Sequence, residues 1–404
     1  MNSGEQPSGN KGNYFHRYLE YASSILAKYK GEEPFHLFLK KYFSANKKHG
    51  SRDRKIISSL CYNYFRLGVG VTSSIDITER ILLSIFLIEK KPSAFLEFLK
   101  PKWNDMIFLP VSEKIKMLPF DFNIKNIFPF NSELSEEIDI DLFNLSFLNQ
   151  PKLFIRIRPG NETIVAHKLD SANVSFEKLN NSCFAFSNSE RVSEVINIDK
   201  EAVIQDYNSQ RTGDFLSSYI EEFTTKISIW DCCAASGGKS ILAFDLLKQI
   251  ELTVTDTRKS ILENLKLRFL KAGIRNYNSF VADLSVHSLP EGIEVLPPFD
   301  LIIADVPCSG SGTWGRTPEQ LSFFSKKSIS KYVLLQQNIV KNAASKLKTG
   351  GHFLYITCSV FKKENEENVD FIQSNLKFTL IKSKYLKGYQ MQADTLFAAF
   401  FEKK

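Results

Sequence analysis

The strongest constraint on the fold is an alternation of apolar strand-like segments with amphipathic helical segments over residues 204–404. Strands are expected at residues 227–231, 251–255, 279–282, 300–304, 353–357, 378–384 and 396–402, and helices at 239–249, 258–272, 328–348 and 364–374. This alternation is typical of a doubly wound sheet with helices on both faces. The continuous apolar run at residues 301–304 favours a strand that is buried on both sides. The sequence therefore predicts an α/β domain in this part of the chain.

Two other regions precede the predicted sheet. Over residues 13–125, apolar side chains recur at every third or fourth position, in segments 14–29, 34–43, 54–67 and 77–87. This period predicts an all-helical domain. The period lapses around residues 110–129, which we interpret as a linker region. Residues 126–203 are expected to hold the rest of that linker and a small α/β module, with strands at 153–158, 174–176 and 183–186 and a helix at 162–169.

Composition narrows the class of protein. The 404 residues are 43% hydrophobic and 24% charged, which is typical of a globular chain and not of a disordered one. Residues 1–12 are polar, so we expect a flexible terminus without a signal peptide. No apolar run approaches about 20 residues, so no membrane span is expected. The net charge of +7 is modest and favours a polyanionic partner such as RNA only weakly.

The six cysteines indicate a reducing compartment. They form no CxxC pair and show no ligand spacing, so we expect free thiols in a cytoplasmic protein and no metal site. Vicinal Cys232 and Cys233 are interpreted as packing residues. Two others, Cys308 and Cys358, each follow a predicted strand in a polar turn. Because ligands bind beyond the carboxyl ends of parallel strands, these two cysteines are candidates for chemistry.

Acidic residues also mark the predicted strand ends. The first strand leads into the glycine-containing turn 231–240, and the next three end at Asp256, Asp283 and Asp305. The turn matches neither a Walker A loop nor a GxGxxG fingerprint. Carboxylates at successive strand ends suit a nucleoside cofactor with hydroxyl and amino groups, for which S-adenosylmethionine is the natural candidate.

The strand-end thiols suit chemistry on a pyrimidine ring. A thiolate that adds to carbon 6 of a pyrimidine makes carbon 5 nucleophilic enough to accept a methyl group. A carboxylic acid must then protonate the ring, and a base must remove the proton from carbon 5. A single buried cysteine is usually a packing residue. Two of them beside Asp305 favour the catalytic interpretation.

Three segments carry a resemblance to a known family. Residues 231–240, residues 305–312 with Arg316 and Pro318, and residues 357–359 followed by 364–366 resemble the Nol/Nop/Sun (RsmB-type) RNA cytosine-5 methyltransferases. Residues 204–210 are similar to the stretch before the cofactor domain in that family, and residues 50–54 resemble its bacterial NusB-like domain. The chain departs from the family pattern at three positions, Ser236, Ile261 and Gly315.

The resemblance implies a fold and a division of roles. The fold would be a Rossmann-like class I methyltransferase domain at residues 204–404, preceded by an RRM-like module and a NusB-like domain. Cys358 would attack carbon 6, and Cys308 would assist release of the product. Asp305 would protonate or hydrogen-bond the cytosine, and Lys239 would reach the base edge. The implied cofactor-binding residues are Cys233, Ala234, Ala235, Ser236, Gly237, Gly238, Lys239, Asp256, Asp283 and Asp305.

Five arginines are candidates for RNA contacts: Arg52, Arg54, Arg156, Arg158 and Arg316. The alternative for the first two is a solvated basic loop. Arg156 and Arg158 alternate with apolar residues in a predicted half-buried strand, where the alternative is a solvated outer face. No obligate protein partner is predicted.

Several functions remain open at this point. The substrate implied for a bacterial member is small-subunit ribosomal RNA, with transfer RNA as the second candidate. A DNA cytosine-5 methyltransferase also uses a Pro-Cys loop, but there that cysteine is itself the nucleophile, so the position of the nucleophile separates the two classes. A non-catalytic RNA-binding scaffold would leave Cys308 and Cys358 without a purpose.

Overall fold

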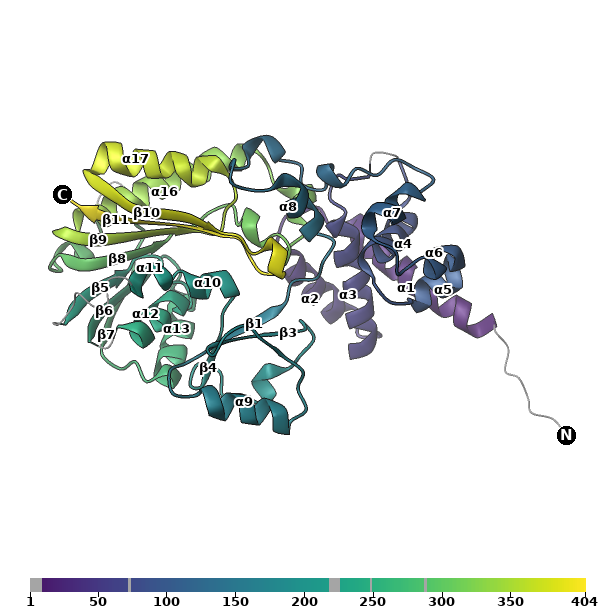
Figure 1. Ribbon diagram of the computed structural model, residues 1–404, viewed down its shortest axis with the longest axis horizontal. Helices are drawn as coiled ribbons and strands as arrows, with labels where there is room; N and C mark the ends of the chain where they lie inside the picture. The colour runs from purple at the N-terminus through teal and green to yellow at the C-terminus, as the bar shows by residue number, and fades with distance from the viewer. Residues whose placement is uncertain (1–8, 72–73, 218–225, 248, 287–288) are drawn as a thin grey trace. The chain divides into compact units, whose positions relative to one another are not determined.

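The computed structural model describes residues 9–71, 74–217, 226–247, 249–286 and 289–404. Most of the terminus expected to be flexible, residues 1–8, lies outside these ranges. The chain divides into two compact units (Figure 1). Unit 1 comprises Met1–Asn131, Asp139–Gln150 and Trp314–Phe324, and unit 2 comprises Ser132–Ile138, Pro151–Thr313 and Ser325–Lys404. The predicted small module and the predicted sheet domain therefore fall within one unit.

Unit 1 is built from helices, as the apolar period predicted. The α-helices are α1 (Gly9–Lys28), α2 (Phe35–Ala45), α3 (Ser51–Arg66), α4 (Ile77–Ile88), α5 (Ala94–Leu99), α6 (Pro101–Asp105), α7 (Val111–Lys116), α8 (Ile140–Ser146) and α15 (Gln320–Phe323). Local sequence sets some of the boundaries. The Asp76 side chain, for example, accepts a hydrogen bond from the Glu79 backbone and so caps the start of α4.

The prediction of a linker around residues 110–129 is wrong. This segment contains α7 and the 3₁₀ turn η1 (Ile124–Asn126), and its Ile127 and Phe128 are fully buried. The Phe128 ring lies 5.4 Å from the ring of Trp314 and 5.2 Å from that of Phe143, measured between centroids. The elements are too short to show a helical period, which is why the sequence did not reveal them.

The small module of unit 2 is a four-stranded antiparallel sheet in the order β2-β3-β1-β4. Its elements are β1 (Leu153–Ile157), α9 (Glu162–Ser171), β2 (Glu177–Lys178), β3 (Cys183–Phe186), η3 (Val192–Glu194) and β4 (Ala202–Ile204). The strand predicted at 174–176 is wrong, because pairing with β3 begins only at Glu177. The ring of Phe176 instead stacks on that of Phe184, with 4.6 Å between centroids.

The large sheet has seven strands in the order β10-β11-β9-β8-β5-β6-β7. They are β5 (Ile227–Asp231), β6 (Ile250–Asp256), β7 (Tyr277–Val281), β8 (Phe299–Asp305), β9 (Leu347–Thr357), β10 (Phe378–Leu386) and β11 (Leu396–Lys403). The run from β7 to β9 is parallel, whereas β11 is antiparallel to both β9 and β10. The predicted doubly wound sheet is confirmed, and each strand overlaps its expected place, although β9 begins at Leu347 rather than at residue 353.

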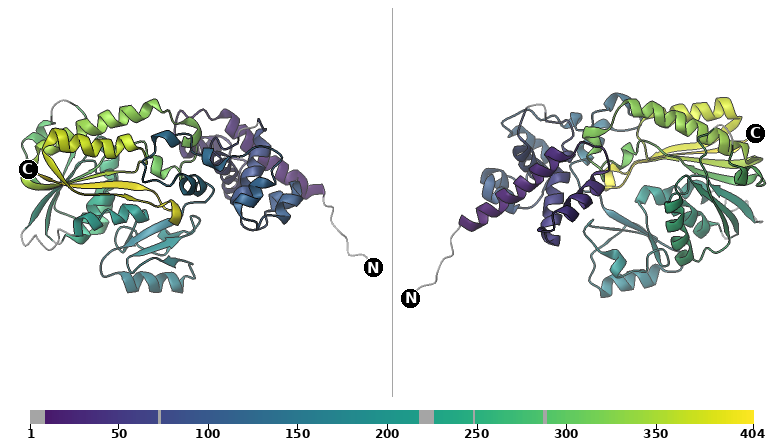
Figure 2. Two further views of the ribbon diagram at one scale, coloured as in Figure 1. Left: turned by 45° about the horizontal axis from the view of Figure 1, so that its top comes forward. Right: turned by 180° about the vertical axis from the view of Figure 1, so that it is seen from behind.

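Helices cover both faces of this sheet. Helices α12 (Gly238–Leu246) and α13 (Lys259–Ala272) lie on one face, and α16 (Lys327–Ser345) and α17 (Glu366–Leu376) lie on the other (Figures 1 and 2). Shorter elements complete the unit: α10 (Tyr207–Arg211), α11 (Asp214–Ser217), α14 (Glu291–Glu294), η2 (Asn131–Glu133) at its border, η4 (Ser311–Thr313), η5 (Lys362–Glu364) and η6 (Tyr389–Met391). No helix in the described part of the chain is long and apolar enough to cross a membrane.

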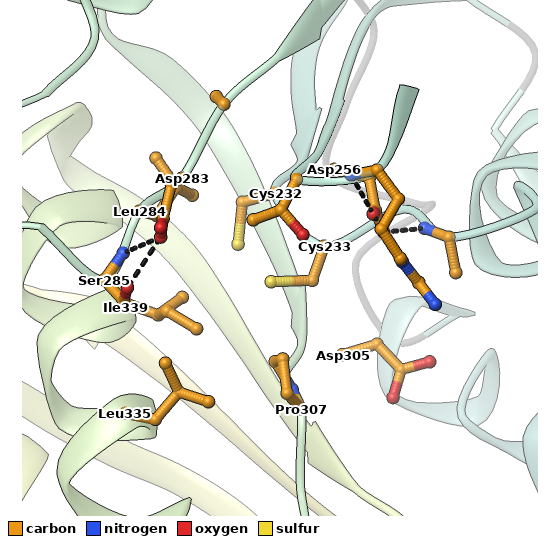
Figure 3. A pocket seen from close by; sticks show the side chains of 14 residues that line it. Cys232, Cys233, Asp256, Asp283, Leu284, Ser285, Asp305, Pro307, Leu335 and Ile339 are labelled. Atoms are coloured by element: carbon orange, nitrogen blue, oxygen red, sulfur yellow. Dashed lines mark hydrogen bonds and ion pairs between the residues drawn. The ribbon is translucent and has the colours of Figure 1, made fainter. Parts of the chain in front are cut away.

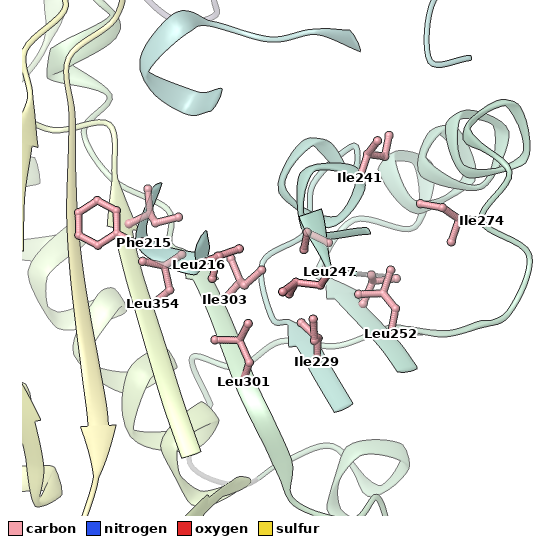
Figure 4. Packing of buried hydrophobic residues seen from close by; sticks show 14 of the residues in the cluster. Phe215, Leu216, Ile229, Ile241, Leu247, Leu252, Ile274, Leu301, Ile303 and Leu354 are labelled. Atoms are coloured by element: carbon pink, nitrogen blue, oxygen red, sulfur yellow. The ribbon is translucent and has the colours of Figure 1, made fainter. Parts of the chain in front are cut away.

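The core of unit 2 lies between the sheet and α12 and α13. Ile229, Leu252 and Ile303 are almost fully buried there and project from neighbouring strands (Figure 4). The strand order matters for function, because β8 lies between β5 and β9 and pairs Asp305 with Ile356 of β9. The carboxyl ends of these strands therefore lie side by side, at the edge where parallel sheets bind ligands.

Candidate active site

The turn after β5 is shaped for close approach of a ligand to the backbone. Gly237 has a φ of 84°, and a Cβ at this position would lie 2.6 Å from the Phe269 ring, so only glycine fits without a shift. Ala235 also takes a positive φ, at 46°. The turn ends where α12 begins, at Gly238. Backbone N–H groups at such a helix start suit a negatively charged group.

A buried aspartate supports this turn. The Oδ2 atom of Asp231 accepts a hydrogen bond of 2.6 Å from the Ser240 hydroxyl, and the side chain is fully buried. Burial is the main reason that the pKa of Asp231 is raised to about 7. The neighbouring charge of Asp305 adds to the rise, whereas Ser240 and Lys239 oppose it.

A cavity of about 540 Å³ opens at the carboxyl ends of β5 to β8 (Figure 3). Its lining residues are Cys232, Cys233, Ala235, Asp256, Thr257, Arg258, Ala282, Asp283, Leu284, Ser285, Asp305, Pro307, Leu335 and Ile339. Five of the predicted cofactor residues are among them, namely Cys233, Ala235, Asp256, Asp283 and Asp305. The other five, Ala234, Ser236, Gly237, Gly238 and Lys239, lie in the adjoining turn and helix start. Cys232, interpreted from the sequence as a packing residue, also faces this cavity.

Asp256 lines the cavity and also hydrogen-bonds to the turn after β5. Its Oδ2 accepts a hydrogen bond of 3.1 Å from the Ala235 backbone, and its Oδ1 accepts one of 2.9 Å from the Arg258 backbone. The Arg258 side chain also pairs with it, at 3.0 Å from Nε to Oδ1. The carboxylate of Asp283 is held by the hydroxyl and backbone N–H of Ser285, at 2.6 and 2.8 Å. The two acids are thus fixed in place by their own loops.

Asp305 and Lys239 form an ion pair beside the cavity. The distance from Lys239 Nζ to Asp305 Oδ2 is 2.8 Å, and the same Nζ donates to the Ser209 hydroxyl at 2.9 Å. Burial alone would lower the pKa of Lys239, but the attraction and hydrogen bond of Asp305 outweigh it, so the pKa is raised. Lys239 is therefore a charged donor that holds the Asp305 carboxylate.

The side chains of the two strand-end cysteines are in contact. The Sγ atoms of Cys308 and Cys358 are 3.2 Å apart, although the residues are fifty positions apart in the chain. The hydrogen bond with Cys358 is the main reason that the pKa of the Cys308 thiol is raised well above its ordinary value. Burial and the negative charge of Glu364 raise it further. The arrangement keeps Cys308 protonated beside its partner sulfur.

The RNA contacts expected of Arg156 and Arg158 do not fit their placement. Both guanidinium groups bind the carboxylate of Asp245 on α12 at 2.7 Å, and the exposed fractions of these two side chains are 7% and 11%. The strand is not half-buried, because the face that carries Arg156 also carries Phe154, which packs against Tyr207. The two arginines instead join the small module to the sheet domain.

The other three arginines lie in unit 1. Arg52 is exposed on the first turn of α3. Arg54 is exposed too, and its Nε donates to the His49 carbonyl at 2.8 Å. Arg316 is partly exposed. RNA contacts by these residues stay predictions.

Some residues around the site were not predicted. Leu335 and Ile339 of α16 form an apolar wall of the cavity, and their spacing of four residues was the available signal. Arg258 follows Asp256 by two residues, a spacing that permits a local ion pair. Ser209 lies in the family-like stretch 204–210 but was not assigned a role, and Gln336 gave no signal because it reaches the site only through the tertiary fold.

Comparison with known proteins identifies the sheet domain. Residues 220–398 match the family model described as "16S rRNA methyltransferase RsmB/F". The chain is 27% identical over 175 residues to ribosomal RNA small subunit methyltransferase B of Xanthomonas campestris pv. campestris, covering 42% of this chain and 38% of that protein. It is 33% identical over 150 residues to tRNA (cytosine(72)-C(5))-methyltransferase NSUN6 of Mus musculus, covering 35% of this chain and 31% of that protein.

A solved structure supports the fold. The crystal structure of NSun6 from Pyrococcus horikoshii with SFG aligns with a TM-score of 0.52 and 16% sequence identity, covering 63% of this chain and 91% of that one. The predicted Rossmann-like methyltransferase fold is thereby confirmed. The sequence alignments span less than half the length of either curated relative. Residues 220–398 of this chain are thus similar to the RsmB/F methyltransferase family.

Proposed function

We propose that this protein is an S-adenosylmethionine-dependent RNA methyltransferase that forms 5-methylcytosine in small-subunit (16S) ribosomal RNA. The observation that carries the proposal is the 3.2 Å separation of the Cys308 and Cys358 sulfurs. The Asp305–Lys239 ion pair lies at the end of β8, beside β9, which leads into Cys358. A scaffold that only binds RNA has no use for two apposed thiols and a held carboxylate.

The cavity fits S-adenosylmethionine. Carboxylates at Asp256, Asp283 and Asp305 are suitable acceptors for ribose hydroxyl and amino hydrogens. Leu284, Leu335 and Ile339 offer an apolar wall for a purine ring. When bound, the cofactor supplies an activated methyl group. The similar NSun6 structure from Pyrococcus horikoshii was solved with SFG, an S-adenosylmethionine analogue.

The residues act in sequence on a flipped-out cytosine. The Cys358 thiolate bonds to carbon 6, and the displaced electron pair makes carbon 5 nucleophilic. Asp305, held by Lys239, hydrogen-bonds or protonates the ring as negative charge develops there. After carbon 5 is methylated, a base takes its proton and the C–H electron pair forms the double bond between carbons 5 and 6. The bond between carbon 6 and sulfur breaks at the same time and returns the Cys358 thiolate. Cys308 assists this last step from its position against the Cys358 sulfur.

The other parts of the chain are proposed to serve RNA binding. The strand order of the small module, with β1 and β3 in the centre and a helix packed on one face, supports an RRM-like assignment. The all-helical elements of unit 1 and the basic start of α3 support a NusB-like RNA-binding domain. A ribosomal RNA substrate also implies a cytoplasmic enzyme.

Methyl transfer to unmodified RNA tests the proposal. Labelled methyl transfer from S-adenosylmethionine to small-subunit ribosomal RNA, mapped at base resolution, is expected to mark one cytosine. Cys358→Ala should reduce the rate by more than about 1,000-fold, because the nucleophile is lost. Cys308→Ala should instead accumulate a protein–RNA adduct that survives denaturation.

Three outcomes separate the alternatives. Transfer to unmodified transfer RNA but not to ribosomal RNA would keep the reaction and replace the substrate. An adduct that needs Cys308 and forms without Cys358 would reverse the two cysteine roles and favour the DNA-enzyme arrangement. Cofactor binding without transfer to either RNA would overturn the proposal.

A further inference from the structure

A buried carboxylate lies between the two cysteine loops and belongs to neither strand. Glu364 is fully buried at the end of η5, six residues after Cys358. Its Oε2 accepts hydrogen bonds from the Ser309 backbone at 2.9 Å and from Gln336 Nε2 at 2.8 Å. Its Oε1 accepts one from the Ser359 hydroxyl at 2.8 Å. One carboxylate thus gathers donors from three separate segments.

Each donor is close to a cysteine. Ser309 directly follows Cys308, and Ser359 directly follows Cys358. Gln336, on α16, uses the same Nε2 atom to bond the carbonyl of Pro307, at 2.9 Å. The Cys308 loop is therefore held on both sides of the cysteine, and the Cys358 loop is held on one side.

The physical chemistry makes these contacts strong. A carboxylate removed from water is stable only when donors replace its hydration. Hydrogen bonds to a charged acceptor are about twice as strong as neutral ones. The paired residues of β8 and β9 end at Asp305 and Ile356, before either cysteine is reached. Beyond that point, backbone bonds such as Gly312 to Cys358 at 2.9 Å act together with Glu364.

We infer that Glu364 is a positioning residue that sets the separation and orientation of the Cys308 and Cys358 thiols. Nothing in the proposed reaction requires it to touch RNA or cofactor. Its catalytic consequence rests on the proposed function, whereas its effect on the distance between the thiols does not. The negative charge of Glu364 also contributes to the raised pKa of Cys308, in keeping with its closeness to that thiol.

Glu364→Gln is the test, because it keeps the shape of the side chain but replaces an acceptor oxygen with a donor. Glu367→Gln, at an exposed position on the first turn of α17, is the matched control. The first readout is oxidation by diamide, which takes one hydrogen from each thiol as the S–S bond forms. The rate of the Cys308–Cys358 disulfide is followed by alkylation and peptide mass mapping. Steady-state methyl transfer is measured in parallel.

We expect the disulfide to form at least about tenfold more slowly in Glu364→Gln, because the sulfurs are no longer held in contact. The kcat of methyl transfer should fall by about 10- to 100-fold, since small misplacement of reacting groups has effects of this size. The KM for S-adenosylmethionine should stay within about twofold of the wild-type value. Glu367→Gln should match the wild type in all three.

A wild-type disulfide rate in Glu364→Gln would overturn the inference. If that variant does not fold, Ser359→Ala removes one donor and decides the question. A slower disulfide in Ser359→Ala supports the inference, and an unchanged rate overturns it. Failure of the wild type to methylate any RNA would count against the proposed function alone, because the disulfide rate still reports the positioning.

Discussion

Asp256 has two functions at the level of single residues. It lines the cavity, and it accepts hydrogen bonds from the backbones of Ala235 and Arg258. Asp256→Ala should weaken S-adenosylmethionine binding by about 10- to 100-fold, the loss expected when a charged acceptor is removed. Calorimetric titration with the cofactor measures this. Glu263→Ala, which removes an exposed acid of α13, should bind as the wild type does. Unchanged affinity in Asp256→Ala would remove this residue from the site.

Asp231 makes stability depend on pH. Its pKa is raised to about 7 in the folded protein, mainly by burial, so between about pH 4 and 7 the folded state holds a proton that the unfolded chain has lost. The contribution of Asp231 to stability therefore falls as pH rises through this window and is constant above it. The Asp231→Asn variant has no titrating carboxyl group at this position, so it lacks this pH dependence.

Urea unfolding of both proteins at several pH values checks this expectation. The free energy of unfolding of the wild type, relative to Asp231→Asn, should fall by up to about 1.4 kcal/mol per pH unit between pH 4 and 7. Parallel curves for the two proteins would show that Asp231 is ionised in the folded state.

Among the elements, β1 and α12 are joined by a buried ion cluster. Asp245 of α12 neutralises both Arg156 and Arg158. Asp245→Ala leaves the buried Arg156 and the largely buried Arg158 without their carboxylate, which should reduce the free energy of unfolding by about 3–5 kcal/mol. Chemical denaturation measures the change. The control is Glu194→Ala, which breaks the exposed pair with Arg191 and should cost less than about 1 kcal/mol. Equal losses in the two variants would contradict the structural role of the cluster.

The long elements of the sheet domain were predictable because their patterns are local. The apolar run at 301–304 needs only burial on both sides, and it is found within β8. The ends of β5 and β6 place Asp231 and Asp256 at one edge of the sheet, as expected from parallel pairing. Periodicity therefore located both the sheet and most of its acidic strand ends.

The predictions that failed concern residues whose partners are brought to them only by the tertiary fold. Alternation places Arg156 and Arg158 on one face of a strand but does not state what covers that face, and here it is α12. In the sequence, Glu364 is interpreted as the polar start of a helix. Its contact with Ser309 arises only from the tertiary fold. Short elements such as α7 were not predicted for another reason, because six residues contain too few turns to show a helical period.

For the whole molecule, the net charge of +7 and the basic start of α3 predict salt-dependent RNA binding. The Arg52→Ala/Arg54→Ala variant should lower the slope of log affinity against log salt concentration by about 1.5, since each phosphate contact contributes about 0.7–0.9. Filter binding over a range of salt concentrations measures the slope. The variant Arg191→Ala/Lys266→Ala removes the same charge from exposed positions of unit 2 and should keep the wild-type slope. An unchanged slope in the α3 variant would place the RNA elsewhere.

The strand order also has a consequence for synthesis of the protein. Strand β11 lies between β9 and β10, yet it follows both in the chain. During translation, β9 can pair with β8 but has a bare outer edge until residues 396–403 emerge from the ribosome. Bare edges invite pairing with other chains. The strand that leads into Cys358 is thus among the last to be enclosed, and premature termination before Leu396 would leave its outer edge unpaired.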